Sequence, residues 1–359
     1  MYLDAMQATV ASFSRRGVLG LGGKLGLGLG VAAGLGGLSG LAAGPAAAAS
    51  PAPGKAGALD LSTAADNIYA FAKTWGTLGD EIVFGGHEGV FFAVVGNRRA
   101  MPLFGYVGFG SLQFRILPTG DAEYRGKDAT FYTDLKTGEL LDTWQNPFTG
   151  KTVKVYPYIN EQVTTTIPAS YPADRMVTDA YRWEIAIGNA ASRKEDAHAY
   201  RGDRGESGKS VPFVLPWRRV GNHYLLTWDW MLEVANPVTP EGWPEASTGP
   251  VINPSEHFTF FVPAAELEDR GRPWATMTAG FFRQCPWLPW MRMGKSGVEG
   301  RMFANSHSYK ITGGLDNIPR PVRARLERDR PDMLTPPRDW SQHPVGSSWG
   351  YYAKVAPKE

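Results

Sequence analysis

Short apolar stretches, separated by glycine and turn-forming residues, dominate the chain beyond about its eightieth residue. Within 224–232 apolar side chains recur at every second position, which is the period of a strand with one buried face. Predicted strands cover residues 82–84, 89–95, 103–117, 130–135, 140–144, 153–158, 162–167, 181–187, 223–234, 257–262, 276–282 and 301–311. Because the connections are short, roughly five to fifteen residues, this pattern favours an antiparallel sheet closed into a barrel or folded into a sandwich.

One segment has the helical period instead. Residues 60–77 carry apolar side chains at helical spacing, and Ser62 or Thr63 can cap the start. We expect this helix to pack against the sheet as a plug or lid. Residues 190–210 are charged and predict an exposed loop, and the arginine- and proline-rich segment 319–344 predicts an extended tail. The pattern therefore predicts a single, mainly β, antiparallel β-barrel-like domain over residues 50–359, with an N-terminal helix and a long extended C-terminal tail.

Residues 1–49 differ in composition and predict a twin-arginine signal peptide. The segment 14–19 (SRRGVL) fits the export motif, a glycine-rich and weakly apolar stretch follows, and four alanines favour cleavage after Ala49. A membrane anchor is the alternative, because the stretch is long enough to span, but its glycines and Lys24 disfavour it. We therefore expect a periplasmic or secreted protein that uses the Tat export machinery and keeps no stable membrane anchor after cleavage.

Charge and cysteine content exclude several classes of protein. Residues 1–49 hold three of the 37 basic and one of the 35 acidic residues, so the rest is formally neutral and predicts no nucleic-acid partner. Cys285 is the only cysteine, which excludes an intramolecular disulfide and cysteine-ligated metal clusters. The motifs of serine hydrolases, zinc proteases and P-loop proteins are absent, and we predict no cofactor.

The six histidines do not have the spacing of a common metal site. His87 and Glu88 are neighbours, but adjacent strand residues point to opposite faces. A site assembled from separate strands, for example by His223, His257 and His307, is an alternative that would imply a metal-dependent hydrolase. Ordinary half-buried histidines are the simpler interpretation.

Three stretches resemble a numbered family of domains of unknown function that is common among exported proteobacterial proteins. They are YTDLKTGE at 132–139 running into WQNPFTG at 144–150, PWLPWMRMG at 286–294, and SSW at 347–349. With the predicted helix they span most of residues 50–359, and the resemblance implies one β-rich, barrel-like domain without established chemistry. After the Asn-Pro turn the chain reads VYPY at 155–158, where the resemblance leads us to expect histidine or another polar group. Any metal site implied by such a histidine is therefore in doubt here.

Aromatic residues are the strongest positive signal, since they make up 12% of the chain. Either the aromatic strand faces fill the core, or they line a pocket in the lumen of a barrel. Polar residues inside these apolar strands are the candidates for general acid–base catalysis. The candidate catalytic residues are His223, Asp229, His257, Glu184 and Tyr156, and the candidate substrate-binding residues are Arg115, Arg182, Trp228, Trp230, Trp290 and His307.

These observations predict an exported, cofactor-independent lyase or isomerase that acts by general acid–base catalysis. Its expected substrate is a hydrophobic or aromatic small molecule, for example one derived from a plant polymer. Three alternatives stay open: a non-catalytic carrier of an apolar ligand, the metal-dependent hydrolase, and a glycan-binding protein that uses exposed tryptophans.

Overall fold

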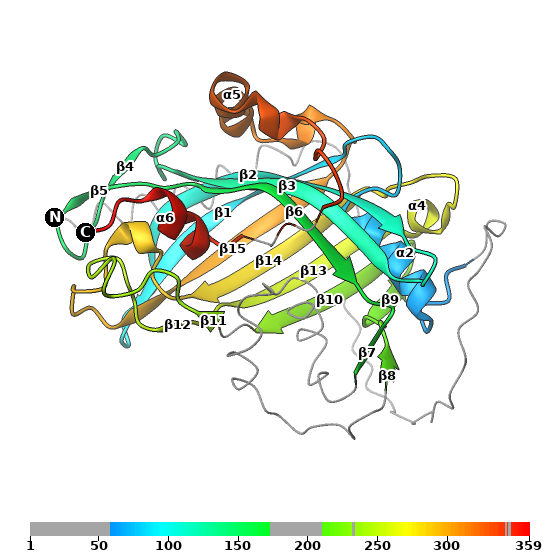
Figure 1. Cartoon of the computed structure of the whole chain (residues 1–359), viewed down its shortest axis with the longest axis horizontal. Helices are drawn as coiled ribbons and strands as arrows, with labels where there is room; N and C mark the ends of the chain where they lie inside the picture. Colours follow the sequence, from blue (N-terminus) through cyan, green and yellow to red (C-terminus); the bar gives the residue numbers. More distant parts are fainter. Residues whose placement is uncertain (1–57, 173–209, 232–233, 342, 344–345) are drawn as a thin grey trace, which may run out of the picture. The chain divides into compact units, whose positions relative to one another are not determined.

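A nine-stranded antiparallel sheet forms the body of the protein (Figure 1). The structure is a computed structural model that describes residues 58–172, 210–231, 234–341, 343 and 346–359. The predicted signal peptide at 1–49, the predicted strand that holds Arg182 and Glu184, and the predicted loop at 190–210 (Ser210 apart) lie outside the described residues.

Among the described strands, β6 (Tyr158–Ile167) and β9 (Trp217–Val220) are the two outermost, and β6 carries an isolated bridge from Thr164 to His343. The order across the sheet is β6, β3 (Ala122–Thr133), β2 (Met101–Ile116), β1 (Phe84–Val95), β15 (Gly300–Lys310), β14 (Met277–Cys285), β13 (Ser255–Pro263), β10 (His223–Met231) and β9. Two-stranded ribbons pair β4 (Thr143–Gln145) with β5 (Thr152–Lys154), β7 (Ser170–Pro172) with β8 (Ser210–Pro212), and β11 (Val234–Ala235) with β12 (Val251–Ile252). The mainly β, antiparallel prediction is confirmed. Among the described residues, β6 and β9 do not pair with each other, so the sheet is not closed into a barrel.

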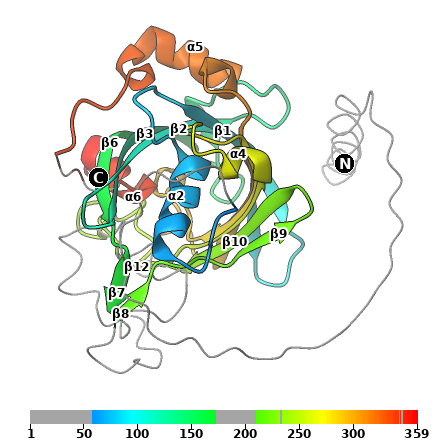
Figure 2. The same cartoon turned by 90° about the vertical axis from the view of Figure 1, so that its right-hand side faces the viewer.

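The sheet curves around helix α2 (Ala64–Trp75), so that it has an inner face and an outer face (Figure 2). The Thr63 side chain accepts a hydrogen bond from the Asp66 amide and thereby caps α2, which confirms the predicted helix. Phe71 of α2 packs edge-on against Trp228 of β10, with ring centroids 5.7 Å apart. This first apolar cluster fills one end of the inner face.

A second apolar cluster fills the other end of the inner face. It packs the short helix η4 (Pro289–Met291) and helix α6 (Ser348–Val355) against β1 to β3. Trp290 of η4 lies 5.0 Å from the rings of Phe104 and of Tyr132, measured between centroids. The two clusters leave the middle of the inner face to other side chains.

The outer face is partly covered by helix α5 (Arg320–Asp329), which lies above the sheet in Figure 1. The predicted extended tail is therefore wrong over this segment. Pro321 fits the first helical turn, where its missing N–H costs nothing. Val322 and Leu326, one turn apart, are buried against outer-face side chains of β2 and β3. Arg325 pairs with Asp329 at 2.7 Å along the exposed side of the helix.

Shorter helices complete the described fold. They are α4 (Ala264–Glu268), η5 (Leu315–Asn317) and η6 (Pro331–Leu334). Within the described part of the chain, no helix has the length and apolar character needed to cross a membrane.

Candidate functional site

Between the two apolar clusters the inner face carries a band of polar side chains. The strand register places His87, Gly108, Thr130 and Tyr158 in one row that crosses β1, β2, β3 and β6. Asp128, two residues from Thr130, is therefore on the same face. We call the following set the inner polar cluster: His87, Tyr106, Asp128, Thr130, Tyr158, Asn160 and Ser306.

Glycine makes room for the histidine of this cluster. A Cβ atom at position 108 would overlap with the imidazole of His87 and with the Ala129 backbone oxygen, so the His87 ring lies over Gly108. From there its Nε2 atom forms a 3.0 Å hydrogen bond with Oγ1 of Thr130. Burial lowers the pKa of His87 to about 4, although the nearby Glu88 carboxylate acts in the opposite direction. At neutral pH the cluster therefore holds a neutral imidazole.

Asp128 is the one carboxyl group of the cluster. It lies opposite Asn160 of β6 in the register and is hydrogen-bonded to Asn160 and Tyr158. Burial raises its pKa to about 7, and these hydrogen bonds oppose the rise only in part. The side chain is still partly exposed. Asp128 can therefore exchange a proton with a molecule that reaches the inner face at neutral pH.

The Tyr158 hydroxyl has two acceptors within reach. It donates to the backbone oxygen of Gly346 at 3.2 Å, and it also interacts with the Asp128 carboxyl. Burial and the adjacent carboxyl raise the pKa of Tyr158 well above its usual value, so the phenol keeps its proton. Because a hydroxyl has a single proton, ionised Asp128 competes with Gly346 for it.

Two further hydroxyl groups extend the cluster across β1. Tyr106 and Ser306 lie on either side of Gly89 and interact across it. Neither hydroxyl has a hydrogen-bond partner of ordinary geometry among the described residues, although both oxygen atoms are buried. Burial raises the pKa of Tyr106 above its usual value. Such groups can donate hydrogen bonds to a polar atom of a bound molecule.

An ion pair lies beside the inner polar cluster, on the side nearer the second apolar cluster. Nε of Arg283 on β14 lies 3.2 Å from a carboxylate oxygen of Glu256 on β13. The Arg283 guanidinium also lies 5.7 Å from the centroid of the Trp349 ring. The inner face thus holds a guanidinium group whose charge is balanced by Glu256, and which can still donate a hydrogen bond to a carbonyl group.

Several predicted site residues lie on the outer face instead. Asp229 of β10 and His257 of β13 are directly opposite each other and hydrogen-bonded, and both are about half exposed. His307 of β15 pairs with Glu88 at 3.1 Å, and this hydrogen bond raises the pKa of His307. His223 is exposed at the start of β10.

Arg115 also belongs to the outer face. It donates to Glu123 at 2.8 Å and stacks on the ring of Trp340. In the part of the chain that the structure describes, no three His, Cys, Asp or Glu side chains come together in a group that could hold a metal ion. The predicted combination of His223, His257 and His307 is therefore not assembled.

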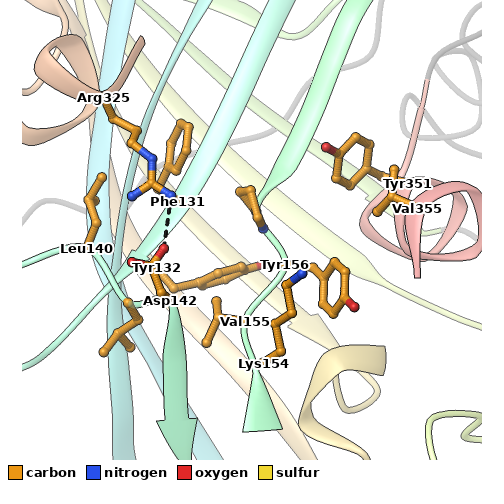
Figure 3. A pocket seen from close by; sticks show the side chains of 12 residues that line it. Phe131, Tyr132, Leu140, Asp142, Lys154, Val155, Tyr156, Arg325, Tyr351 and Val355 are labelled. Atoms are coloured by element: carbon orange, nitrogen blue, oxygen red, sulfur yellow. Dashed lines mark hydrogen bonds and ion pairs between the residues drawn. The ribbon is translucent and has the colours of Figure 1, made fainter. Parts of the chain in front are cut away.

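The predicted tryptophans are core residues. Trp228 and Trp290 are each 2% exposed, and Trp287 and Trp349 are also buried. None of these four rings is open to stack on a glycan. The Trp230 side chain lies outside the described residues, and Tyr156 lines a cavity near α5 and α6 (Figure 3).

Sequence reasoning did not select the inner polar cluster. Asp128 and Tyr106 are not among the predicted site residues, and Tyr158 enters the sequence analysis only as the last residue of the segment 155–158. The available signal was β3, in which Tyr124, Asp128 and Tyr132 alternate with other residues and so share one face. The charged residues of β3 interrupt the apolar pattern by which strands are predicted, although this strand is central to the site.

A comparison with known protein families identifies the chain. The profile of one family matches residues 80–356, which include the whole inner polar cluster. The family is described as "Protein of unknown function (DUF1838)", which confirms the resemblance to a family of domains of unknown function. No curated protein matches the chain.

Proposed function

Because the chain belongs to the DUF1838 family, whose description assigns no activity, we propose its function from the inner polar cluster, its surroundings and the sequence motifs. The protein is an exported acid–base enzyme, a lyase or isomerase, that acts without a cofactor on a small hydrophobic or aromatic molecule. One observation carries this proposal. Asp128 places a carboxyl group, hydrogen-bonded to Tyr158 and Asn160, between two aromatic clusters.

The arrangement supports transfer of a proton from carbon. Ionised Asp128 removes a proton next to a carbonyl group of the substrate, and the electron pair moves onto the carbonyl oxygen. Donors at Tyr106 and Ser306 stabilise that oxygen, since their hydroxyls are buried without other partners of ordinary geometry. Protonated Asp128 then returns the proton to a different carbon, as in an isomerase, or to a departing group, as in a lyase. A carboxyl pKa of about 7 suits both half-reactions at neutral pH.

The surroundings of the cluster support an apolar substrate. Phe281 of β14 is partly exposed on the inner face, and it lies in the same register row as Ser306. Its ring lies 4.7 Å from that of Phe258. A ring or aliphatic body can pack on these side chains while its carbonyl group meets the hydroxyls. The twin-arginine motif supports a periplasmic or secreted location, where polymer-derived molecules are met.

Proton transfer can be tested before the substrate is known. The protein is incubated in D2O with a panel of small aromatic and aliphatic ketones, aldehydes and esters, and deuterium incorporation is followed by mass spectrometry. We expect exchange into at least one compound by the wild type and by Asp316→Asn, which alters a carboxylate that is 89% exposed. Asp128→Asn should lose the exchange.

Two results would contradict the proposal. Equal exchange by the wild type and Asp128→Asn would show that this carboxyl is not the base. Loss of exchange in His257→Ala, with Asp128→Asn unaffected, would instead favour the outer-face pair. Binding of panel members without any exchange would indicate the non-catalytic carrier.

A further inference from the structure

A cavity of about 310 Å³ lies where three distant parts of the chain meet (Figure 3). The end of β3 with the following loop forms one wall, the segment from β5 to β6 forms another, and α5 with α6 completes it. The residues that matter for its chemistry are Asp142, Lys154, Tyr156, Arg325, Tyr351 and Val355. None of these belongs to the inner polar cluster.

One cation of the cavity, Lys154, has no carboxylate partner among the described residues. Arg325 pairs with Asp142 at 2.9 Å, which is the dashed contact in Figure 3, and also with Asp329. The Lys154 ammonium instead lies 5.0 Å from the centroid of the Tyr156 ring. The wall around Lys154 therefore favours an anion with a single charge, and Asp142 disfavours one with more.

The aromatic side chains of the cavity are held in place. Tyr156 packs edge-on against Tyr352 of α6, with ring centroids 5.0 Å apart. Figure 3 shows Tyr351 and Val355 on α6, to the right of Tyr156, and all three side chains line the cavity. Val355 is 42% exposed, which is high for a valine at the rim of an apolar wall. A flat apolar ring fits between these side chains.

We propose that this cavity binds a small aromatic monocarboxylate. The ring lies between Tyr156 and the Tyr351–Val355 wall, and the carboxylate accepts hydrogen bonds from Nζ of Lys154. The proposal does not depend on proton transfer at the inner polar cluster. It assigns Tyr156 to binding at this second site.

The test is calorimetric titration of the full-length protein with benzoate, phenylacetate and 4-hydroxybenzoate. At least one of these acids should bind, and its affinity should fall roughly tenfold to a hundredfold in Lys154→Met, because a charge-assisted hydrogen bond is lost. Benzamide, which lacks the charge, should bind more weakly than benzoate by a similar factor. Lys151→Met is the matched control, since Lys151 pairs with Glu245 and does not line the cavity. It should bind like the wild type.

Each contrary result would overturn the proposal. The proposal is wrong if none of the three acids binds, or if Lys154→Met binds them with unchanged affinity. It is also wrong if inorganic phosphate binds more tightly than any of the acids. A crystal soaked in 4-bromobenzoate gives a second readout, because bromine scatters anomalously. The signal should lie between Tyr156 and Tyr351, and a signal only elsewhere contradicts the assignment. Asp128→Asn should bind the acids normally, so failure of this proposal and failure of the proposed function are distinguishable.

Discussion

Replacing Asp128 by asparagine should stabilise the protein at high pH while abolishing proton transfer. The pKa of Asp128 is about 7 in the folded protein, against an ordinary value of 3.8. The difference of about 3 units corresponds to about 4 kcal/mol at 1.36 kcal/mol per unit. Because the side chain is partly exposed, we expect about 1 to 4 kcal/mol.

The sign follows from where the proton is bound. Below about pH 4 the carboxyl is protonated in both the folded and the unfolded chain, so the wild type and Asp128→Asn differ little in free energy of unfolding. As the pH rises from about 4 to about 7, the carboxyl ionises in the unfolded chain but not yet in the folded one. This ionisation stabilises the unfolded chain, so the free energy of unfolding of the wild type falls relative to that of the variant. Above pH 7 the full difference is reached. Stability gained by removing a functional charge is a common trade-off.

Urea unfolding, followed by tryptophan fluorescence at a series of pH values between 4 and 8, measures this difference. Asp316→Asn serves as the control, because its carboxylate is 89% exposed and should give no pH-dependent gain. A difference between wild type and Asp128→Asn that is the same at every pH would refute the reasoning. So would a variant that is less stable than the wild type at pH 8.

Three further predictions concern packing and charge. Gly108→Ala places a methyl group against a backbone oxygen, so it should lower the melting temperature and reduce the free energy of unfolding by about 1–3 kcal/mol. Gly110→Ala is the control and should reduce the free energy of unfolding less, because the nearest atom to its added Cβ is 3.8 Å away. Leu326→Ala should cost about 2–5 kcal/mol in urea unfolding if α5 packs on the outer face, and a change under 0.5 kcal/mol would place the helix elsewhere. Glu88→Gln should lower the pKa of His307 in an NMR titration, and an unchanged value would argue against their hydrogen bond.

The sequence pattern predicted the parts of the fold that rest on local periodicity. Thr63 with the apolar positions of 64–75 identified α2, and alternation in 223–231 placed Trp228 and Asp229 on opposite faces. The open edges of the sheet are not a local property. Closure into a barrel depends on whether the two outermost strands of the sheet pair with each other, and no residue pattern within either strand determines this pairing.

The predictions of the C-terminal tail and of the site residues were wrong for different reasons. The arginines and prolines of 319–344 predicted an extended chain. The segment nevertheless forms a helix, because Val322 and Leu326 lie on one side of it and are buried against the sheet. The inner polar cluster depends on cross-strand neighbours, such as Gly108 beside His87, that are far apart in the sequence. Choosing polar residues within apolar strands selected the solvated outer face, because exposed strand faces are normally polar.

The pH dependence of deuterium incorporation tests the central claim most directly, namely that the Asp128 carboxyl transfers protons. For any compound that exchanges, the rate catalysed by the wild type should rise with pH across about 7, as Asp128 ionises, and then level off. Asp128→Asn should show no catalysed exchange at any pH. An identical pH profile in the wild type and Asp128→Asn would contradict the account.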